Sequence, residues 1–248
     1  MWYAKPRHGY SVGSTEGTAN ATEIASYLAS KEYTLESICA ILGNIGGEGG
    51  LNPWRWESDY VPTVSEFQNW TSEQAIKHGY GLVGFTPANR YINAQNESAL
   101  FDYGYSPNFA DAPGEAEDGL AQTVFFESEI EPTVTNTSGA WAFSYYAASF
   151  ETQLGFNVQD VWNLIDYTFE QFKTDNTIPL EFLVGFFELK YEKPAAELTH
   201  GDTTTYPAAD SYWGRVSVAQ YYYNYFSENP IPGFDFFTQQ HHLPIWMY

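Results

Sequence analysis

The sequence predicts a single, mostly helical domain of the α+β class, with a small β or loop region beside a glycine-rich helix end. Three observations favour this fold class. Apolar residues recur at spacings of three and four in several segments, which is the period of a helix with one buried face. This period is lost between Leu51 and Thr86, where Trp, Pro, Ser and Gly are frequent. Finally, 44% of the 248 residues are hydrophobic, enough to bury a substantial core.

Capping residues and apolar stripes predict the first two helices. Residues 1–18 are polar and glycine-rich and are expected to form an extended arm. Asn20 is then the expected N-cap of a helix over 21–30. Thr34 is the expected N-cap of a second helix, which the glycines from Gly46 onward should end. The apolar stripe of this second helix consists of Leu35, Ile38, Ile41, Leu42 and Ile45.

The middle of the chain has a weaker pattern. The segment GYGLVGF, residues 79–85, is predicted to be a strand or one arm of a hairpin. A helix is expected near 115–128, where apolar residues again follow the helical period. The stretch 132–156 has no clear period, and we interpret it as an insertion in the domain.

The C-terminal half is predicted to be helical again. Helices are expected over 157–172, 179–191 and 208–226. Pro179 would start the second of these helices, and Pro194 would stop it. The domain is expected to cover 19–228 and to be followed by an aromatic tail over 229–248.

Charge and hydropathy exclude several classes of partner. The chain has 10 Lys and Arg against 31 Asp and Glu, a net charge of -21. Nucleic acids and anionic membrane surfaces recruit basic patches, so neither is expected as a partner. No run of about 18 apolar residues predicts a membrane span. No basic segment followed by an apolar one opens the chain as a secretion signal would, so synthesis in a cytoplasm is expected.

Metal, nucleotide and cysteine chemistry are also disfavoured. The five His include no His-Glu-x-x-His pair, so no metal site is expected, and no cofactor either. The glycine cluster that starts at Gly46 lacks the Gly-Lys-Ser/Thr ending of a phosphate loop. The single cysteine, Cys39, excludes an intramolecular disulfide, and its place in an apolar helical run predicts a buried, inert thiol.

Glu48 is the candidate catalytic residue that the pattern singles out. It lies among four glycines, Gly46, Gly47, Gly49 and Gly50, which suit either a tight turn or the approach of a ligand to the backbone. If the helical turn persists, Glu48 continues the apolar stripe, loses hydration and faces the negative end of the helix dipole. Both effects favour the protonated form that a general acid needs. The alternative is a surface glutamate in a glycine turn.

A glycosidase usually needs a second carboxylate across a cleft. Glu57 and Asp59 are the candidates, because they follow in the irregular region that would form the opposite wall, and Glu66 is a weaker third choice. Each is alternatively a solvated loop residue. Aromatic residues make up 19% of the chain, so some of their area is expected to face a ligand such as a sugar or a partner protein; the alternative is an aromatic-rich core.

Three motifs in order give a family resemblance. ICAILGNIGGEGGLNP, GYGLVGFTPANRYI and FLVGFFELKYEKP resemble segments of the phage tail lysozymes, the cell-wall-degrading domains at the tail tip of phages that infect Gram-positive bacteria. Among these, the sequence resembles the lysozyme domain of the tail-knob protein of short-tailed phages. The likeness runs from about Ala21 to Phe226.

The resemblance implies a lysozyme-like fold and assigns residues to a site. Glu48 matches the family's catalytic glutamate in the pattern Gly43-Asn44-x-x-x-Glu48. It would protonate the glycosidic oxygen between N-acetylmuramic acid and N-acetylglucosamine in peptidoglycan. The residues that would bind substrate or line the cleft floor are Asn44, Tyr80, Gly81, Leu82, Phe85 and Thr86.

Two departures from the family pattern stand out. Family members usually have Glu-Ser where this chain has Glu48-Gly49, and Gln-Trp where it has Gly84-Phe85. The absent Gln removes a polar group expected near the substrate. Glu192 is expected to have a structural role, pairing with the backbone or with an arginine such as Arg90.

The acidic charge favours delivery by a virion. Bacterial walls are anionic, so a domain at -21 is repelled at long range, whereas tethering to a phage tail supplies a high local concentration. The predicted location is therefore the tail tip, with peptidoglycan strands and phage tail proteins as partners. Lytic transglycosylation remains an alternative to hydrolysis. A non-catalytic tail or wall-binding protein and a free lysin remain alternatives to a tail enzyme.

Overall fold

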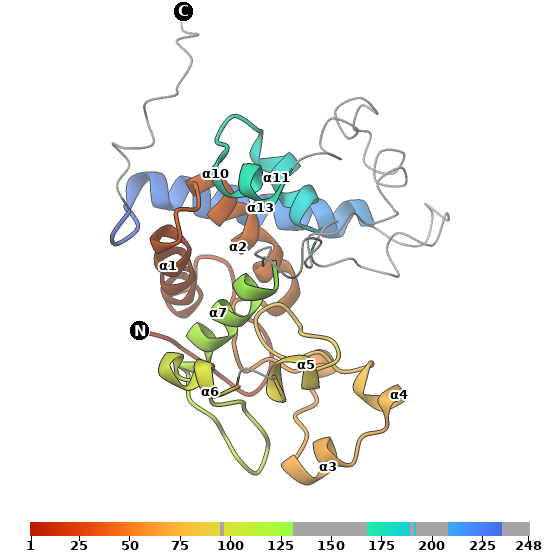
Figure 1. The fold of residues 1–248 in the computed structure, drawn as a ribbon. Coiled ribbons are helices and arrows are strands. Elements are labelled where there is room, and N and C mark those ends of the chain that lie inside the picture. Colours follow the sequence, from red (N-terminus) through yellow and green to blue (C-terminus); the bar gives the residue numbers. More distant parts are fainter. Residues whose placement is uncertain (95–96, 131–167, 189–190, 192–207, 235–248) are drawn as a thin grey trace, which may run out of the picture.

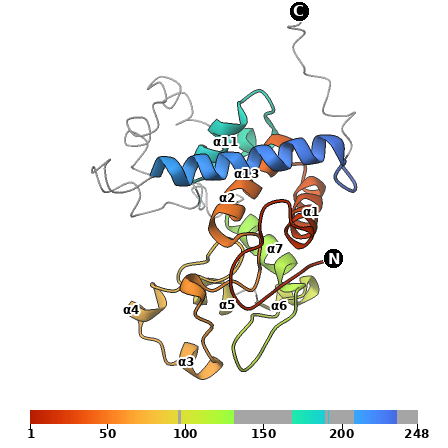
Figure 2. The ribbon, with the colours of Figure 1, turned by 180° about the vertical axis from the view of Figure 1, so that it is seen from behind.

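The computed structural model describes residues 1–94, 97–130, 168–188, 191 and 208–234. Figures 1 and 2 show two layers: α1, α2, α10, α11 and α13 form an upper layer, and the short helices α3 to α6 form a lower lobe, with α7 between them. The longer helices are α1 (Thr15–Ser30), α2 (Leu35–Gly49), α7 (Asp118–Ile130), α10 (Phe169–Thr174), α11 (Leu180–Phe187) and α13 (Ala208–Glu228). The short ones are η1 (Glu57–Asp59), α3 (Val64–Gln68), α4 (Ser72–Ala75), α5 (Asn89–Ile92), α6 (Glu97–Leu100) and η2 (Phe101–Tyr103).

The first helix begins earlier than the sequence predicts. Ser14, not Asn20, is the N-cap of α1, and its hydroxyl accepts from the backbone N–H of Gly17. The predicted arm is therefore four residues too long, since residues 15–18 are helical. Asn20 is buried inside the helix, where its amide bonds to the backbone of Tyr3 and Leu51. These hydrogen bonds connect the N-terminal segment at Tyr3 to the residue that follows the C-cap of α2, Leu51.

The second helix is capped by Thr34 as predicted, but the glycines do not end it at Gly46. It continues to Gly49 and ends at Gly50, which has φ of 55° in the left-handed region. Glu48 thus lies in the last helical turn. The glycines are retained within the helix because α13 packs closely against them, so tertiary contact outweighs their low helix propensity.

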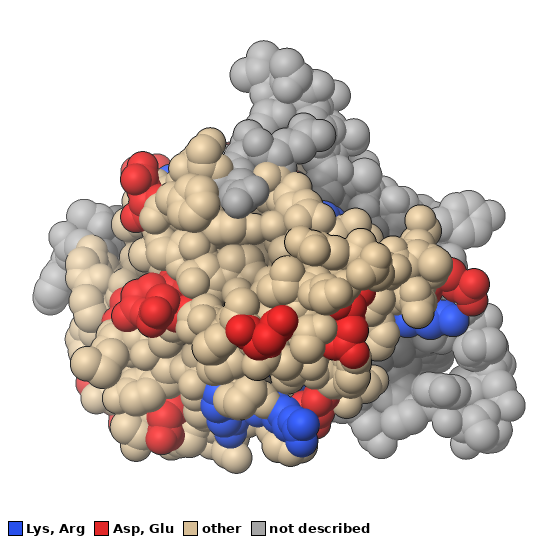
Figure 3. Space-filling model, turned by 90° about the horizontal axis from the view of Figure 1, so that it is seen from below, with Lys and Arg blue, Asp and Glu red and all other residues tan. Residues whose placement is uncertain are grey.

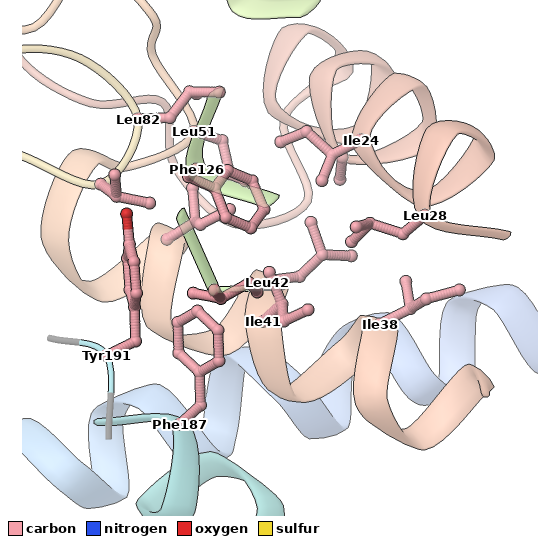
Figure 4. Packing of buried hydrophobic residues seen from close by; sticks show 14 of the residues in the cluster. Ile24, Leu28, Ile38, Ile41, Leu42, Leu51, Leu82, Phe126, Phe187 and Tyr191 are labelled. Carbon is pink, nitrogen blue, oxygen red and sulfur yellow. The ribbon is translucent and has the colours of Figure 1, made fainter. Parts of the chain in front are cut away.

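The core is centred on α2, which packs against α1, α10, α11 and α13. Figure 4 shows apolar side chains from several elements meeting there, with Ile24, Leu28, Ile38, Ile41, Leu42, Phe126 and Phe187 among them. Cys39 is fully buried in the same cluster, and burial raises the pKa of its thiol well above the usual value, as expected for an inert cysteine.

The predicted β region is not confirmed. Within the described residues, pairing is limited to isolated bridges between Trp56 and Tyr80 and between Tyr80 and Phe85. The GYGLVGF segment is a tight turn closed by two backbone hydrogen bonds between Tyr80 and Phe85, with N···O distances of 3.2 and 2.8 Å. Gly81 and Gly84 have positive φ, so the chain turns back before a strand can extend.

The remaining helices agree with the prediction in part. The helix expected near 115–128 is α7, and the one expected over 208–226 is α13. Pro179 precedes α11 as predicted, although α11 ends at Phe187, before the predicted end. Helix α10 begins only after Thr168, which is extended and caps it, so no helix runs through Thr168 as the predicted 157–172 helix would.

Several predictions concern residues outside the described ranges. These are the insertion over 132–156, the first part of the 157–172 helix, Glu192, and the tail beyond Phe234. Among the described residues, no helix is both long enough and apolar enough to cross a membrane.

Candidate active site

A cavity of about 240 Å³ lies at the C-terminal end of α2. Its lining residues are Glu48, Arg55, Glu57, Gly79, Gly81, Gly84 and Thr86. Four residues predicted for the site are thereby brought together from three parts of the chain: Glu48, Glu57, Gly81 and Thr86. Much of the lining is glycine backbone, which leaves room for a bulky ligand beside the two carboxylates.

Glu48 faces this cavity from the upper layer. Its side chain is 38% exposed, and its carboxylate forms an ion pair with Nη2 of Arg215 from α13. The carboxylate of Glu48 is thus held by a cation from a helix that is distant in the sequence. The setting of Glu48 therefore includes an interaction that the local sequence does not show.

Arg215 is held from several directions beneath Glu48. It is only 2% exposed, and its Nη1 donates to Oδ1 of Asn44 at 2.9 Å. Its Nε lies 3.5 Å from Oε1 of Glu188, which follows α11. Asn44 also donates to the backbone carbonyls of Ala40 and Val184. Asn44 is thus completely buried and fixes Arg215, rather than lining the cavity.

The glycines around Glu48 make room for α13. A Cβ on Gly43 would come within 2.6 Å of the carbonyl oxygen of Arg215, and one on Gly47 within 2.8 Å of the Arg215 Cγ. Both distances are too short for non-bonded carbon, so side chains there would push the helices apart. The glycine cluster therefore permits the helix crossing that brings Arg215 to Glu48.

Glu57 faces the cavity from the lower lobe. Its Oε2 accepts from the backbone N–H of Gly79 at 2.8 Å, and its own N–H donates to the Gly79 carbonyl at 2.9 Å. These two bonds hold η1 on the turn that contains Gly81 and Thr86. Glu57 is thus the second carboxylate that the structure places at the cavity with Glu48.

A model of the family described as phage tail lysozyme matches residues 19–226. The chain belongs to the phage tail lysozyme family. A similar protein is morphogenesis protein 1 of Bacillus phage B103, which is 31% identical over 100 residues. That match covers 40% of this chain and 23% of the relative, so the chain aligns with about a quarter of that protein's length. Family membership supports a glycosidase-like enzyme associated with phage tails.

The other candidate carboxylates lie outside the cavity lining. Asp59 pairs with the His8 ring, Nδ1 to Oδ2 at 2.7 Å, and accepts from the His8 backbone N–H at 2.8 Å. That backbone hydrogen bond, with the nearby charges of His8, Arg55 and Arg7, lowers the pKa of Asp59. Glu66 caps α3 through Thr63. Asp59 thus anchors the N-terminal segment.

Tyr80 and Phe85 support the cleft floor from inside. Both are completely buried, and so is Leu82. The Tyr80 hydroxyl donates to Oδ2 of Asp118 at 2.9 Å, and burial raises its pKa well above the usual value. Phe85 stacks on Tyr91, with ring centroids 5.1 Å apart. These side chains therefore support the Gly81 turn from the core and are not among the residues that line the cavity.

Arg55, Gly79 and Gly84 line the cavity although the sequence did not predict them for the site, and the prediction also missed Arg215. A signal for it exists, since it is the one charged residue between Ser211 and Ser227, in a helix otherwise made of apolar, aromatic and neutral polar residues. Such an isolated charge on a packed helix needs a buried partner.

Across the described ranges, no three His, Cys, Asp or Glu residues gather where they could hold a metal ion.

Proposed function

We propose that this chain is a phage tail-associated peptidoglycan hydrolase. It cleaves the glycan strand between N-acetylmuramic acid and N-acetylglucosamine at the tail tip and so helps the genome to cross the wall. The observation that supports the proposal most directly is the cavity at the end of α2, where Glu48 and Glu57 come from opposite layers. Most glycosidases use two carboxylic acid side chains that flank the scissile bond.

In the proposed mechanism Glu48 is the general acid. It gives its proton to the glycosidic oxygen as the bond to the leaving sugar breaks. The guanidinium of Arg215 then stabilises the carboxylate that remains, because a neighbouring cation favours the ionised form. Arg215 also fixes the direction in which the Glu48 side chain points.

Glu57 is proposed as the second carboxylate. In hydrolysis it would activate the attacking water or stabilise positive charge on the sugar ring. In lytic transglycosylation the 6-hydroxyl of the muramic acid replaces the water, and a second carboxylate is not required. A Glu57→Gln variant therefore distinguishes the two routes, because only hydrolysis assisted by Glu57 is slowed strongly.

The test is digestion of purified peptidoglycan, with products analysed by mass spectrometry. The wild-type chain is expected to release fragments with reducing muramic acid ends. Glu48→Gln should slow release by about 100-fold or more, because general acid catalysis is lost. Glu73→Gln is the matched control, since this exposed glutamate pairs with Lys77 away from the cavity. Anhydro ends would indicate a transglycosylase, and the absence of products would contradict an enzymatic function.

The second candidate is a non-catalytic wall-binding tail protein. The ion pair between Glu48 and Arg215 favours it, because it gives Glu48 a structural reason to be present. The glycine at position 84, where family members usually have Gln, also favours it. This candidate predicts that wild type and Glu48→Gln bind walls equally and release nothing. Detection of the protein in purified virions would separate either tail role from that of a free lysin.

A further inference from the structure

The lower lobe contains a second cavity, of about 360 Å³, between α3, α4 and α5. Its lining residues are Val64, Phe67, Gln68, Trp70, Ala75, Asn89, Ile92, Asn93 and Phe109. It shares no lining residue with the cavity at Glu48. Its lining also contains no charged side chain, although the chain carries a net charge of -21. The cavity is therefore suited to an uncharged ligand.

Aromatic rings form one wall of this second cavity. The ring of Phe67 lies 5.4 Å from that of Trp70 and 5.4 Å from that of Phe109. Phe67 and Trp70 are only partly buried, so they keep accessible surface at the cavity. Ring surfaces of this kind pack against apolar C–H groups of a ligand.

Carboxamides supply the polar groups of the same cavity. Gln68 is the last residue of α3, and Asn89 and Asn93 lie at the two ends of α5. All three are exposed, and none makes a side-chain hydrogen bond to another residue that the structure describes. Each carboxamide offers both a donor and an acceptor. The cavity thus presents uncommitted donors and acceptors beside an aromatic wall.

We propose that this cavity binds an uncharged saccharide containing N-acetylhexosamine, at a site separate from the catalytic cavity. A pyranose ring has C–H faces for Phe67 and Trp70, and its hydroxyl and acetamido groups pair with the carboxamides. An anionic ligand would find no cation in the lining. The proposal concerns binding alone and does not depend on catalysis at Glu48.

The aromatic wall also connects the two cavities. Trp56 packs against Phe67, Trp70 and Phe109 on one side and forms a backbone bridge with Tyr80 on the other. His78 stacks on Trp70 at 4.6 Å and directly precedes Gly79 of the catalytic cavity. A saccharide held in the second cavity is therefore held by the same lobe that carries Glu57.

The experiment titrates tri-N-acetylchitotriose into the full chain carrying Glu48→Gln, with side-chain amide signals followed by NMR. The amides of Gln68, Asn89 and Asn93 are expected to shift. The double variant Asn89→Ala/Asn93→Ala should bind at this site about tenfold more weakly, because two hydrogen-bonding groups are lost. The control is Gln220→Ala/Asn224→Ala, an exposed carboxamide pair on α13.

Two ligand sources are compared in separate arms. One arm uses the glycan of peptidoglycan freed of its peptides, with the muramic acid carboxylates converted to amides so that the strand is uncharged. The other arm uses an uncharged wall polysaccharide that contains N-acetylhexosamine but no muramic acid. Binding of either supports the proposal and identifies the source. The proposal is overturned if saccharide shifts only signals of the catalytic cavity, or if the double variant binds as tightly as its control.

Discussion

At the scale of single residues, Arg215 contributes most to the setting of Glu48. It is an almost completely buried cation between two carboxylates, Glu48 and Glu188, with Asn44 as a neutral acceptor. Removing a charge of this kind from water is unfavourable, and the ion pairs and the hydrogen bond offset it only while they are all in place. Arg215 is consequently both a stabilising and a positioning residue.

Replacing Arg215 with Met should lower the free energy of unfolding by about 3 kcal/mol, because it leaves Glu188 buried without this cation. Urea unfolding measures the change. Arg215→Lys keeps the charge but not the planar fork and should recover part of the stability. Equal stability of the Met variant and the wild type would show that the ion pairs contribute nothing.

Gly47 and Gly214 form a matched pair of helical glycines. A Cβ on Gly47 would meet the Arg215 Cγ at 2.8 Å, whereas one on the exposed Gly214 has nothing within 4 Å. Gly214→Ala should stabilise the protein by about 0.5–1 kcal/mol through helix propensity alone. Gly47→Ala should instead lower the stability, because its Cβ displaces Arg215, and should lower peptidoglycan cleavage by about tenfold, because the displaced Arg215 misplaces Glu48. Cleavage unaffected by Gly47→Ala would exclude a positioning role for Arg215.

At the scale of elements, the lower lobe is organised by a buried carboxylate in place of a sheet. Asp118, at the start of α7, is completely buried and accepts from the hydroxyls of Tyr80 and Tyr91. It also accepts from the Ser106 backbone N–H and the Gln122 amide. Burial raises the pKa of Asp118, and these hydrogen bonds counteract the rise. Segments far apart in sequence thereby converge on one side chain.

Asp118→Asn should destabilise the protein by about 3 kcal/mol. An asparagine amide would point an N–H group at neighbours that are themselves donors, leaving buried groups unsatisfied. Thermal unfolding measures the effect, and hydrogen exchange should show the largest loss of protection in the 79–86 turn. Asp102→Asn on the exposed side of η2 is the control and should change stability little. The same small effect at Asp118 would contradict its role as the centre of the lobe.

The sequence predicts the elements whose buried face repeats locally. Apolar spacing locates α2 and α13, and the Thr34 cap sets where α2 begins. The local sequence does not predict where α2 ends. Gly46 and Gly47 are tolerated inside the helix only through contact with α13, which lies far along the chain. A local pattern contains no information about such a contact.

In the candidate site, too, the local sequence predicts some features, and contacts with distant segments determine others. Glu48, predicted from its motif, and Glu57, predicted from its place in the irregular region, both line the cavity at the end of α2. The family motif predicts Tyr80 and Phe85 at the cleft floor, whereas the structure buries both completely. Their inward orientation depends on Asp118 and Tyr91, partners that the local motif does not include.

At the scale of the whole molecule, the dominant property is acidic charge. Figure 3 shows acidic groups spread over one face, with a few Lys and Arg gathered toward its lower edge. A net charge of -21 opposes approach to an anionic wall, and dissolved salt screens this repulsion beyond about 8 Å at physiological ionic strength.

Cleavage of intact walls by the isolated protein should therefore speed up as NaCl is added from a low concentration. The measurement is the loss of turbidity of a wall suspension. Glycan strands stripped of anionic polymers are the control substrate and should show little dependence on salt. A rate on intact walls that falls with added salt would mean that attraction, not repulsion, controls the encounter.

The crossing of α2 and α13 has a consequence for when activity can arise during synthesis. Glu48 and Arg215 are 167 residues apart in the chain. At ordinary rates of translation, roughly ten to thirty seconds separate the two residues at the ribosome. During that interval a nascent chain carries the proposed acid without the helix that orients it. The proposed wall-cutting site is thus not complete until translation has passed α13.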